Sequence, residues 1–141
     1  FKLQIAGHNG SSAWIPLSSV DMTLDPHTQL RILETMVAHT QYTWAGDSTL
    51  EAIELATAKA KDGELIIAVS DANLQRYRIE PSDVAGLLQR ADVHSHLVLI
   101  GSLGNEATEL ANAIPNGRAQ VCARSEELPL QLKKIVASIT R

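Results

Sequence analysis

A hydroxyl and a carboxylate, those of Thr49 and Asp71, are the side-chain groups of this chain best suited to hold a hard metal ion. Mg²⁺ takes oxygen ligands and usually keeps several waters, so one hydroxyl and one carboxylate on neighbouring loops are suitable partial ligands. Asp47 and Asn73 each stand two residues from one of these side chains and are candidates to orient it through a hydrogen bond. The chain therefore carries the parts of an incomplete Mg²⁺ site.

Both residue types also have a structural interpretation. A threonine in the first turn of a helix is usually a cap, and an aspartate at the end of a strand usually caps the following turn. For Thr49 and Asp71 the sequence leaves the metal site and these capping roles open as alternatives.

A glycine-containing turn, Gly101–Gly104, precedes a predicted helix and offers a second kind of chemistry. Glycine permits close backbone approach, and free N–H groups at a helix start can bind a phosphate. The turn matches neither the dinucleotide fingerprint nor the lysine-containing P-loop, and no Gly-x-Ser-x-Gly nucleophile motif occurs. A nucleotide- or phosphate-binding enzyme is therefore the alternative function, and a tight strand-to-helix turn is the structural interpretation.

Histidine and cysteine give no comparable metal motif. His94 and His96 fall on one face of a predicted strand, but no third ligand follows at a recognisable spacing. We interpret them as structural or surface residues. The single cysteine, Cys122, lies in a predicted strand and is interpreted as a small buried apolar residue.

The chain opens with an expected antiparallel hairpin. Apolar alternation predicts a strand over residues 1–6, and a second strand is predicted over 13–17 after the turn-rich residues 8–12. Pro16 lacks a backbone N–H, which places the second strand at the edge of a sheet. The chain thus begins inside a strand.

Two helices are expected next. Asp25 and Pro26 form a cap and a first helical position, and Leu30, Leu33 and Val37 then recur at helical spacing to about His39. The second helix begins with a capping-box pattern at residues 48–51 and ends at Asp62 and Gly63. Thr49 is therefore expected in a first helical turn.

Three strands alternating with helices follow. The strands are predicted over residues 64–70, 96–100 and 119–123, and the apolar character of the first predicts burial on both faces. The helices are expected to begin at Pro81 and to cover residues 106–114 and 128–139. This order predicts one α/β domain over residues 1–141, with a doubly wound, mostly parallel sheet and an antiparallel edge strand. Ligands of such sheets bind at the carboxyl ends of the strands, where Asp71 is expected.

The overall composition narrows the possible partners. Of the 141 residues 45% are hydrophobic, which is ordinary for a globular chain, and the net charge of -4 argues against binding to nucleic-acid phosphates. The longest apolar runs are far below the roughly 18 residues of a membrane-spanning helix. A single cysteine cannot form an internal disulfide, which favours a reducing, intracellular compartment.

The hairpin opening and three short segments, at residues 46–49, 70–74 and 100–104, together resemble a von Willebrand factor A domain. Their sequences are Gly-Asp-Ser-Thr, Ser-Asp-Ala-Asn-Leu and Ile-Gly-Ser-Leu-Gly. The resemblance extends from Phe1 to about Ile139. It is strongest to the domain at the carboxyl terminus of large mitochondrial AAA+ ATPases that are related in design to midasin and dynein.

This resemblance implies a metal-ion-dependent adhesion site built from three loops. Thr49 and Asp71 match the second and third loops. The first loop, Asp-x-Ser-x-Ser, occurs nowhere in these residues, and the central strand that carries it is absent with it. A sheet without a central strand leaves unpaired backbone groups. We therefore expect that strand to be supplied upstream or by another chain, and residues 1–141 alone to fold poorly.

The resemblance also implies a function. Such a domain is a protein-interaction module, in which an acidic partner side chain completes the coordination of Mg²⁺, or which docks on the AAA+ ring. ATP hydrolysis would occur in other domains, so this segment is not expected to be an enzyme. A mitochondrial location follows from the same resemblance, and a structural domain with a degenerate metal site remains a third alternative.

Overall fold

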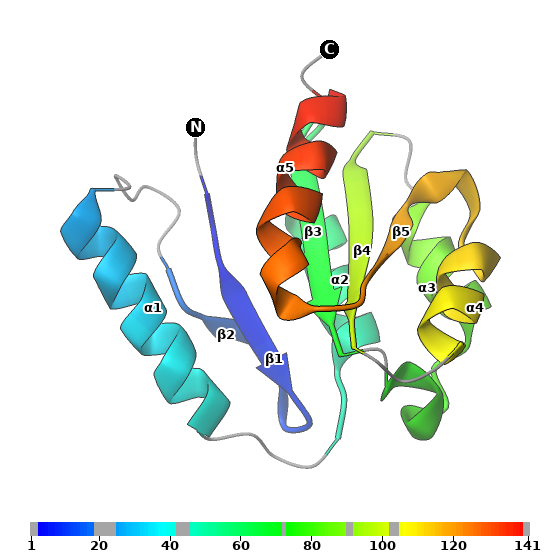
Figure 1. The fold of residues 1–141 in the computed structure, drawn as a ribbon, viewed down its shortest axis with the longest axis horizontal. Coiled ribbons are helices and arrows are strands. Elements are labelled where there is room, and N and C mark those ends of the chain that lie inside the picture. Colours follow the sequence, from blue (N-terminus) through cyan, green and yellow to red (C-terminus); the bar gives the residue numbers. More distant parts are fainter. Residues whose placement is uncertain are drawn as a thin grey trace. The chain divides into compact units, whose positions relative to one another are not determined.

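The structure is a computed structural model (Figure 1), and it forms two compact units, residues 1–52 and 53–141. The residues that it describes are 3–18, 25–41, 46–71, 73–89, 92–101 and 105–139. The strands and helices are, in chain order, β1 (Ala6–Asn9), β2 (Ser12–Pro16), α1 (Pro26–Gln41), α2 (Thr49–Lys59), β3 (Leu65–Ser70), α3 (Pro81–Leu88), β4 (His94–Ile100), α4 (Glu106–Ala113), β5 (Ala119–Cys122) and α5 (Leu128–Ile139). The predicted α/β order of elements is confirmed.

The hairpin of the first unit is organised by its turn. The Asn9 side-chain oxygen accepts hydrogen bonds from the N–H groups of Ser11 and Ser12, at 2.9 and 3.0 Å. Asn9 pairs with Ser12, and Ala6 with Pro16, which confirms the antiparallel pair. Of the strand predicted over residues 1–6, residues 1–2 lie outside the described residues, and residues 3–5 are not part of a strand, because β1 begins at Ala6.

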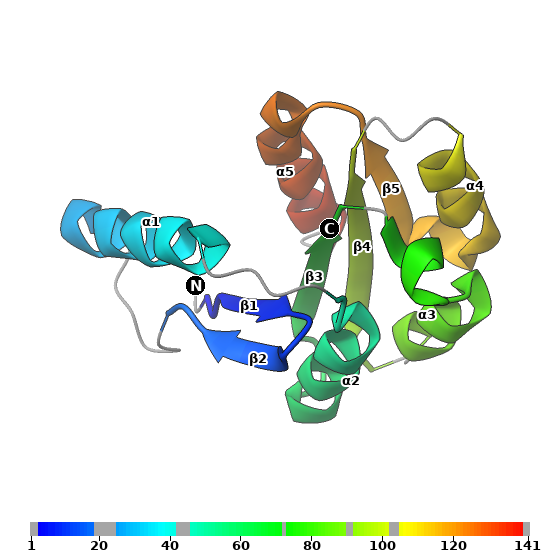
Figure 2. The ribbon, with the colours of Figure 1, turned by 90° about the horizontal axis from the view of Figure 1, so that it is seen from below.

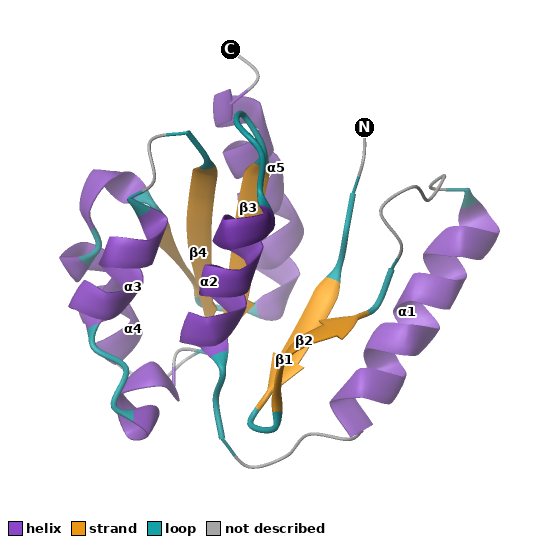
Figure 3. Ribbon diagram, turned by 180° about the vertical axis from the view of Figure 1, so that it is seen from behind, coloured by secondary structure: helices purple, strands orange, loops and turns teal. Residues whose placement is uncertain are grey.

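Helix α1 begins as predicted. The Asp25 carboxylate accepts hydrogen bonds from the N–H groups of His27 and Thr28 and from the Thr28 hydroxyl, and these bonds lower its pKa. The helix runs alongside the hairpin (Figure 3). Its buried apolar residue is Ile32, whereas the predicted apolar positions Leu30 and Val37 are 54% and 60% exposed. None of the described helices is long and apolar enough to cross a bilayer.

The second unit is built on a parallel sheet in the order β3-β4-β5. Helix α5 covers one face, and α3 and α4 cover the other (Figure 2). Under α5 the core contains Val98, Cys122 and Ile135, and the last of these belongs to α5 itself. The middle strand is the most deeply buried, and its Leu97, Val98 and Leu99 have no exposed surface.

Strand β3 departs from the prediction of burial on both faces. Its residues Leu65–Ala68 are only half-buried, and Val69 is 38% exposed. Within the described part of the second unit, β3 pairs with β4 on one side only. The apolar run therefore predicts the strand correctly but not how deeply it is buried, because burial depends on which segments pack against the strand.

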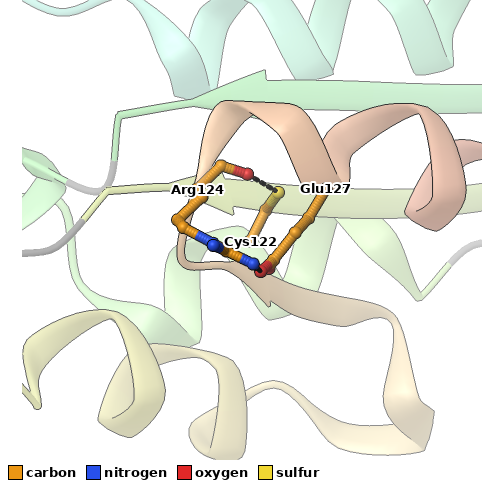
Figure 4. Close-up of polar contacts among 3 residues, drawn as sticks. All are labelled: Cys122, Arg124 and Glu127. Atoms are coloured by element: carbon orange, nitrogen blue, oxygen red, sulfur yellow. Dashed lines mark hydrogen bonds and ion pairs between the residues drawn. The ribbon is translucent and has the colours of Figure 1, made fainter.

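The thiol of Cys122 is buried at the end of β5. Its Sγ donates to the backbone oxygen of Arg124 at 3.0 Å, and Arg124 in turn pairs with Glu127 at 2.9 Å (Figure 4). These contacts fix the turn that leads into α5. The interpretation of Cys122 as a buried structural residue is confirmed.

His96 is the half-buried histidine of β4. Burial lowers its pKa from the ordinary value, and the nearby positive charges of Arg118 and His94 lower the pKa further. Its Nδ1 atom is buried and has no hydrogen-bond partner among the described residues. The folded protein therefore binds a proton at His96 less readily than the unfolded chain does.

This difference predicts a loss of stability in acid. Above pH 6.5, the ordinary pKa of histidine, His96 is neutral in both the folded and the unfolded protein. As the pH falls below 6.5, His96 takes up a proton in the unfolded chain before it does so in the folded protein. The free energy of unfolding therefore decreases. We expect Tm to fall less on acidification in His96→Gln than in the wild type. In His27→Gln, which changes an exposed histidine, Tm should fall as much as in the wild type. Identical Tm profiles from pH 8 to 5 for the wild type and His96→Gln would contradict the prediction.

Candidate metal site

Thr49 is the first residue of α2 and is completely buried. Its N–H donates to the Asp47 carboxylate at 2.6 Å, so Asp47 caps this helix start. The Thr49 hydroxyl oxygen has no hydrogen-bond partner in the part of the chain that the structure describes. The structural interpretation of Thr49 as a cap is therefore wrong.

A buried hydroxyl without a partner costs about 1–3 kcal/mol relative to one that is satisfied. Thr57, two turns later in the same helix, shows the usual solution, because its buried hydroxyl donates to the backbone oxygens of Ile53 and Glu54, both at 2.9 Å. Thr49 has no preceding helical turn to offer such an oxygen. Its position at the start of α2 therefore leaves the hydroxyl without the local partner that Thr57 has.

A close contact between two glycines positions the loop that carries Asp47 and Thr49. Gly46 has a positive φ of 127°, and a Cβ atom built on it would lie 2.9 Å from the Cα of Gly10 in the hairpin turn. Only glycine satisfies both conditions. In the sequence Gly46 stands out only as part of the Gly-Asp-Ser-Thr segment, because nothing there signals contact with a residue 36 positions away.

Asp71 follows the last residue of β3 and is exposed. One carboxylate oxygen accepts the Asn73 N–H at 3.2 Å, and the other accepts the Asn73 side-chain N–H at 3.0 Å. Asp71 therefore has the capping role that its position predicts. Because the carboxylate is exposed, its remaining lone pairs are accessible to a cation.

The loop after β4 lies against the backbone of Asp71. Gly101 has a positive φ of 149°, and a Cβ atom on it would lie 3.2 Å from the Asp71 backbone oxygen. Parallel pairing of Ser70 with Leu99 brings the carboxyl ends of the two strands together. The rest of the predicted phosphate-binding turn, residues 102–104, lies outside the described residues, as does Ala72.

The four predicted site residues thus form two local pairs. Asp47 contacts Thr49 in the first unit, and Asn73 contacts Asp71 in the second. Each pair is described within its own unit. Across the described ranges, no three side chains of His, Cys, Asp or Glu gather closely enough to hold a metal ion by themselves.

The chemistry of these residues fits Mg²⁺ in part. The unpaired Thr49 hydroxyl and the accessible Asp71 carboxylate are both oxygen donors, the ligand type that Mg²⁺ prefers. Mg²⁺ keeps near-octahedral coordination, so two protein ligands leave positions for waters and other groups.

The chain is 38% identical, over 144 residues, to von Willebrand factor A domain-containing protein 8 of Mus musculus. The similarity covers 98% of this chain but only 8% of that protein, and it does not assign the segment to the carboxyl terminus. No protein-family model and no solved structure matches the chain. A parallel three-stranded sheet with an antiparallel pair and helices is consistent with a von Willebrand factor A-like α/β fold.

The glycine contact predicts a specific sensitivity of the first unit. Gly46→Ala should lower the free energy of unfolding by about 1–3 kcal/mol, because it adds a strained φ to a clash with Gly10. The matched control is Gly86→Ala in α3, where an added Cβ atom would meet no atom beyond the adjacent residues and the helix backbone within 4 Å, and it should be neutral or raise stability by about 0.5–1 kcal/mol. Urea unfolding of the full-length protein measures both; equal midpoints for the two variants would show that the contact is unimportant.

Proposed function

We propose that this chain is a von Willebrand factor A-type module that binds a protein partner through a Mg²⁺ ion held in part by Thr49 and Asp71. The observation that carries the proposal is the buried Thr49 hydroxyl, which has no partner among the described residues. The similarity to a protein named for its von Willebrand factor A domain supports the type of module.

Within this proposal each residue has a defined part. The Thr49 hydroxyl binds the ion directly, and the Asp71 carboxylate binds it directly or through a water. Asp47 holds the start of α2 through its hydrogen bond to the Thr49 N–H, and Asn73 holds the Asp71 carboxylate. Mg²⁺, when bound, supplies a coordination position for an acidic side chain of the partner.

The remaining ligands are expected from an Asp-x-Ser-x-Ser loop, which these 141 residues do not contain. The resemblance assigns that loop to the end of a central strand. Among the described residues of the second unit β3 pairs with β4 alone, and this supports a further strand beside it. Thr49 and Asp71 are therefore proposed to supply only some of the ligands of a larger metal site.

The module is proposed to belong to the carboxyl-terminal part of a large mitochondrial AAA+ ATPase. There it would dock a substrate protein or the ATPase ring, while ATP hydrolysis occurs in other domains. The chain spans 8% of the relative it matches, which is the size expected of one module in a large protein.

The unpaired hydroxyl predicts that Thr49 reduces stability in the absence of metal. In EDTA, Thr49→Val should raise the free energy of unfolding by about 1 kcal/mol, because it removes a buried polar group that has no partner and keeps the side-chain shape. Thr57→Val, in the same helix, should lower it by a similar amount, because it removes satisfied hydrogen bonds. Changes of the same sign in urea unfolding would refute this account of Thr49.

Metal binding tests the proposed function itself. Calorimetric titration of the full-length protein with Mg²⁺, without nucleotide, should show that Thr49→Ser retains affinity because it keeps the hydroxyl. Thr49→Val and Asp71→Ala should each weaken binding about tenfold or more. Unchanged Mg²⁺ binding in both of these variants would contradict the proposed function and would favour the alternative of a structural domain with a degenerate metal site.

A further inference from the structure

One side of helix α1 carries a row of exposed apolar side chains. Leu30, Leu33 and Val37 are 54%, 58% and 60% exposed, and Met36 at the border of the row is exposed as well. Residues three and four positions apart lie on the same side of a helix, so these side chains form one continuous strip, here called the α1 row. Exposed apolar groups that gather in one place, in contrast to single ones, mark an interaction surface.

The α1 row is not the side through which α1 packs in its own unit. The packed side carries Ile32, which is buried, and His39, whose ring would lie only 2.5 Å from a Cβ atom on Gly7 of the hairpin. Ile32 and His39 are seven positions apart and share one side of the helix. Among the described residues of the first unit, the hairpin therefore takes this side of α1 and leaves the α1 row exposed.

The spacing within the α1 row is that of helices that pair with one another. Residues 26, 30, 33 and 37 follow at intervals of four, three and four, the alternation that forms the seam between two helices. The helix has 16 residues, and at a rise of about 1.5 Å per residue it is about 24 Å long. It is therefore long enough to present this seam as four successive layers.

The α1 row complements itself when a second copy of the helix lies antiparallel to the first. A two-fold axis between residues 31 and 32 places Leu30 against Leu33 of the partner subunit, and the reverse. Residues on the same border of the seam face each other in such a pair, so Glu34 comes alongside the partner's His27. Each copy supplies both members of these contacts, as a two-fold interface requires.

The charges of α1 also permit two copies to approach. Its permanently charged residues are one arginine and one glutamate, Arg31 and Glu34, so the helix is close to neutral although the whole chain has a net charge of -4. A strongly acidic or basic partner gains little from such a face, because charge steers an encounter only where one sign predominates. A neutral seam with a matched pair on its border fits a second copy of the same helix.

We propose that the α1 row is a contact between two copies of this chain, in which the two helices pair antiparallel about a two-fold axis. The contact is independent of the proposed function, because the α1 row contains none of the residues of the candidate metal site. One helix face supplies less surface than the about 800 Å² per partner of a stable complex. Association through α1 alone is therefore weak, and the dimer fraction rises with protein concentration.

Two variants of the full-length protein, each with one added thiol, test both the contact and its direction. Leu30→Cys and Leu33→Cys are mixed at high protein concentration under mild oxidation, and the disulfide-linked dimer is measured on a non-reducing gel. In the antiparallel register a thiol at position 30 faces one at position 33, within the distance that a disulfide can bridge. The mixture should therefore give about tenfold more linked dimer than either variant alone, in which the thiols lie in different layers.

A charge in the seam provides a second measurement. Val37→Glu, added to both thiol variants, should lower the yield of linked dimer about tenfold, because pairing then buries an unpaired carboxylate. The matched control is Leu130→Glu in α5, which changes a leucine of similar exposure, 56%, outside the α1 row and should leave the yield unchanged. Urea midpoints show whether each variant remains folded, and the buried Cys122 is common to all of them.

Two kinds of result would overturn the inference. Linked dimer that forms as readily within each single variant as in the mixture would show that the helices do not pair antiparallel in this register. No linked dimer in any sample, or a yield that Val37→Glu leaves unchanged, would show that the α1 row is not a contact between copies. Another segment of the polypeptide or a different partner would then be its occupant.

Discussion

The parallel pairing of β4 with a strand on each side is the interaction on which the second unit depends. It buries Leu97, Val98 and Leu99 completely and gives α5 one face to cover and α3 and α4 the other. It also aligns the carboxyl ends of β3 and β4, which brings Gly101 onto the backbone of Asp71. The geometry of the candidate carboxylate ligand is therefore a consequence of strand pairing.

In the first unit, polar groups have a similar organising role. The Asn9 side chain closes the hairpin turn, and the contact of Gly10 with Gly46 fixes the loop that leads into α2. Asp47 then accepts a hydrogen bond from the Thr49 N–H at the start of that helix, whereas the sequence left a capping role open for Thr49 itself. Among the described residues the buried Thr49 hydroxyl has no hydrogen-bond partner, as is also true of the buried Ser95 hydroxyl in the second unit.

Both halves of the candidate site have the same design, in which a neighbouring polar side chain holds the segment that carries the proposed ligand. Asp47 and Asn73 each stand two residues from their partners, so these contacts are local and require no distant strand. Thr49 stands at the start of a helix and Asp71 just after the end of a strand. This is the usual property of a loop-built site, whose ligands are carried by connections and positioned by the scaffold beneath them.

The sequence by itself determined the order of the helices and strands, the start of α1 at Asp25, the antiparallel hairpin and the parallel sheet, because these follow from apolar periodicity and local hydrogen bonds. It also identified the neighbours Asp47 and Asn73, which act over two residues. Only the tertiary structure decided that β3 is half-exposed, that Leu30 and Val37 lie on the open side of α1, and that Gly46 meets Gly10. The burial of a residue and its close contacts depend on which segments become neighbours in space. The apolar periodicity of a sequence carries no information about which segments these are.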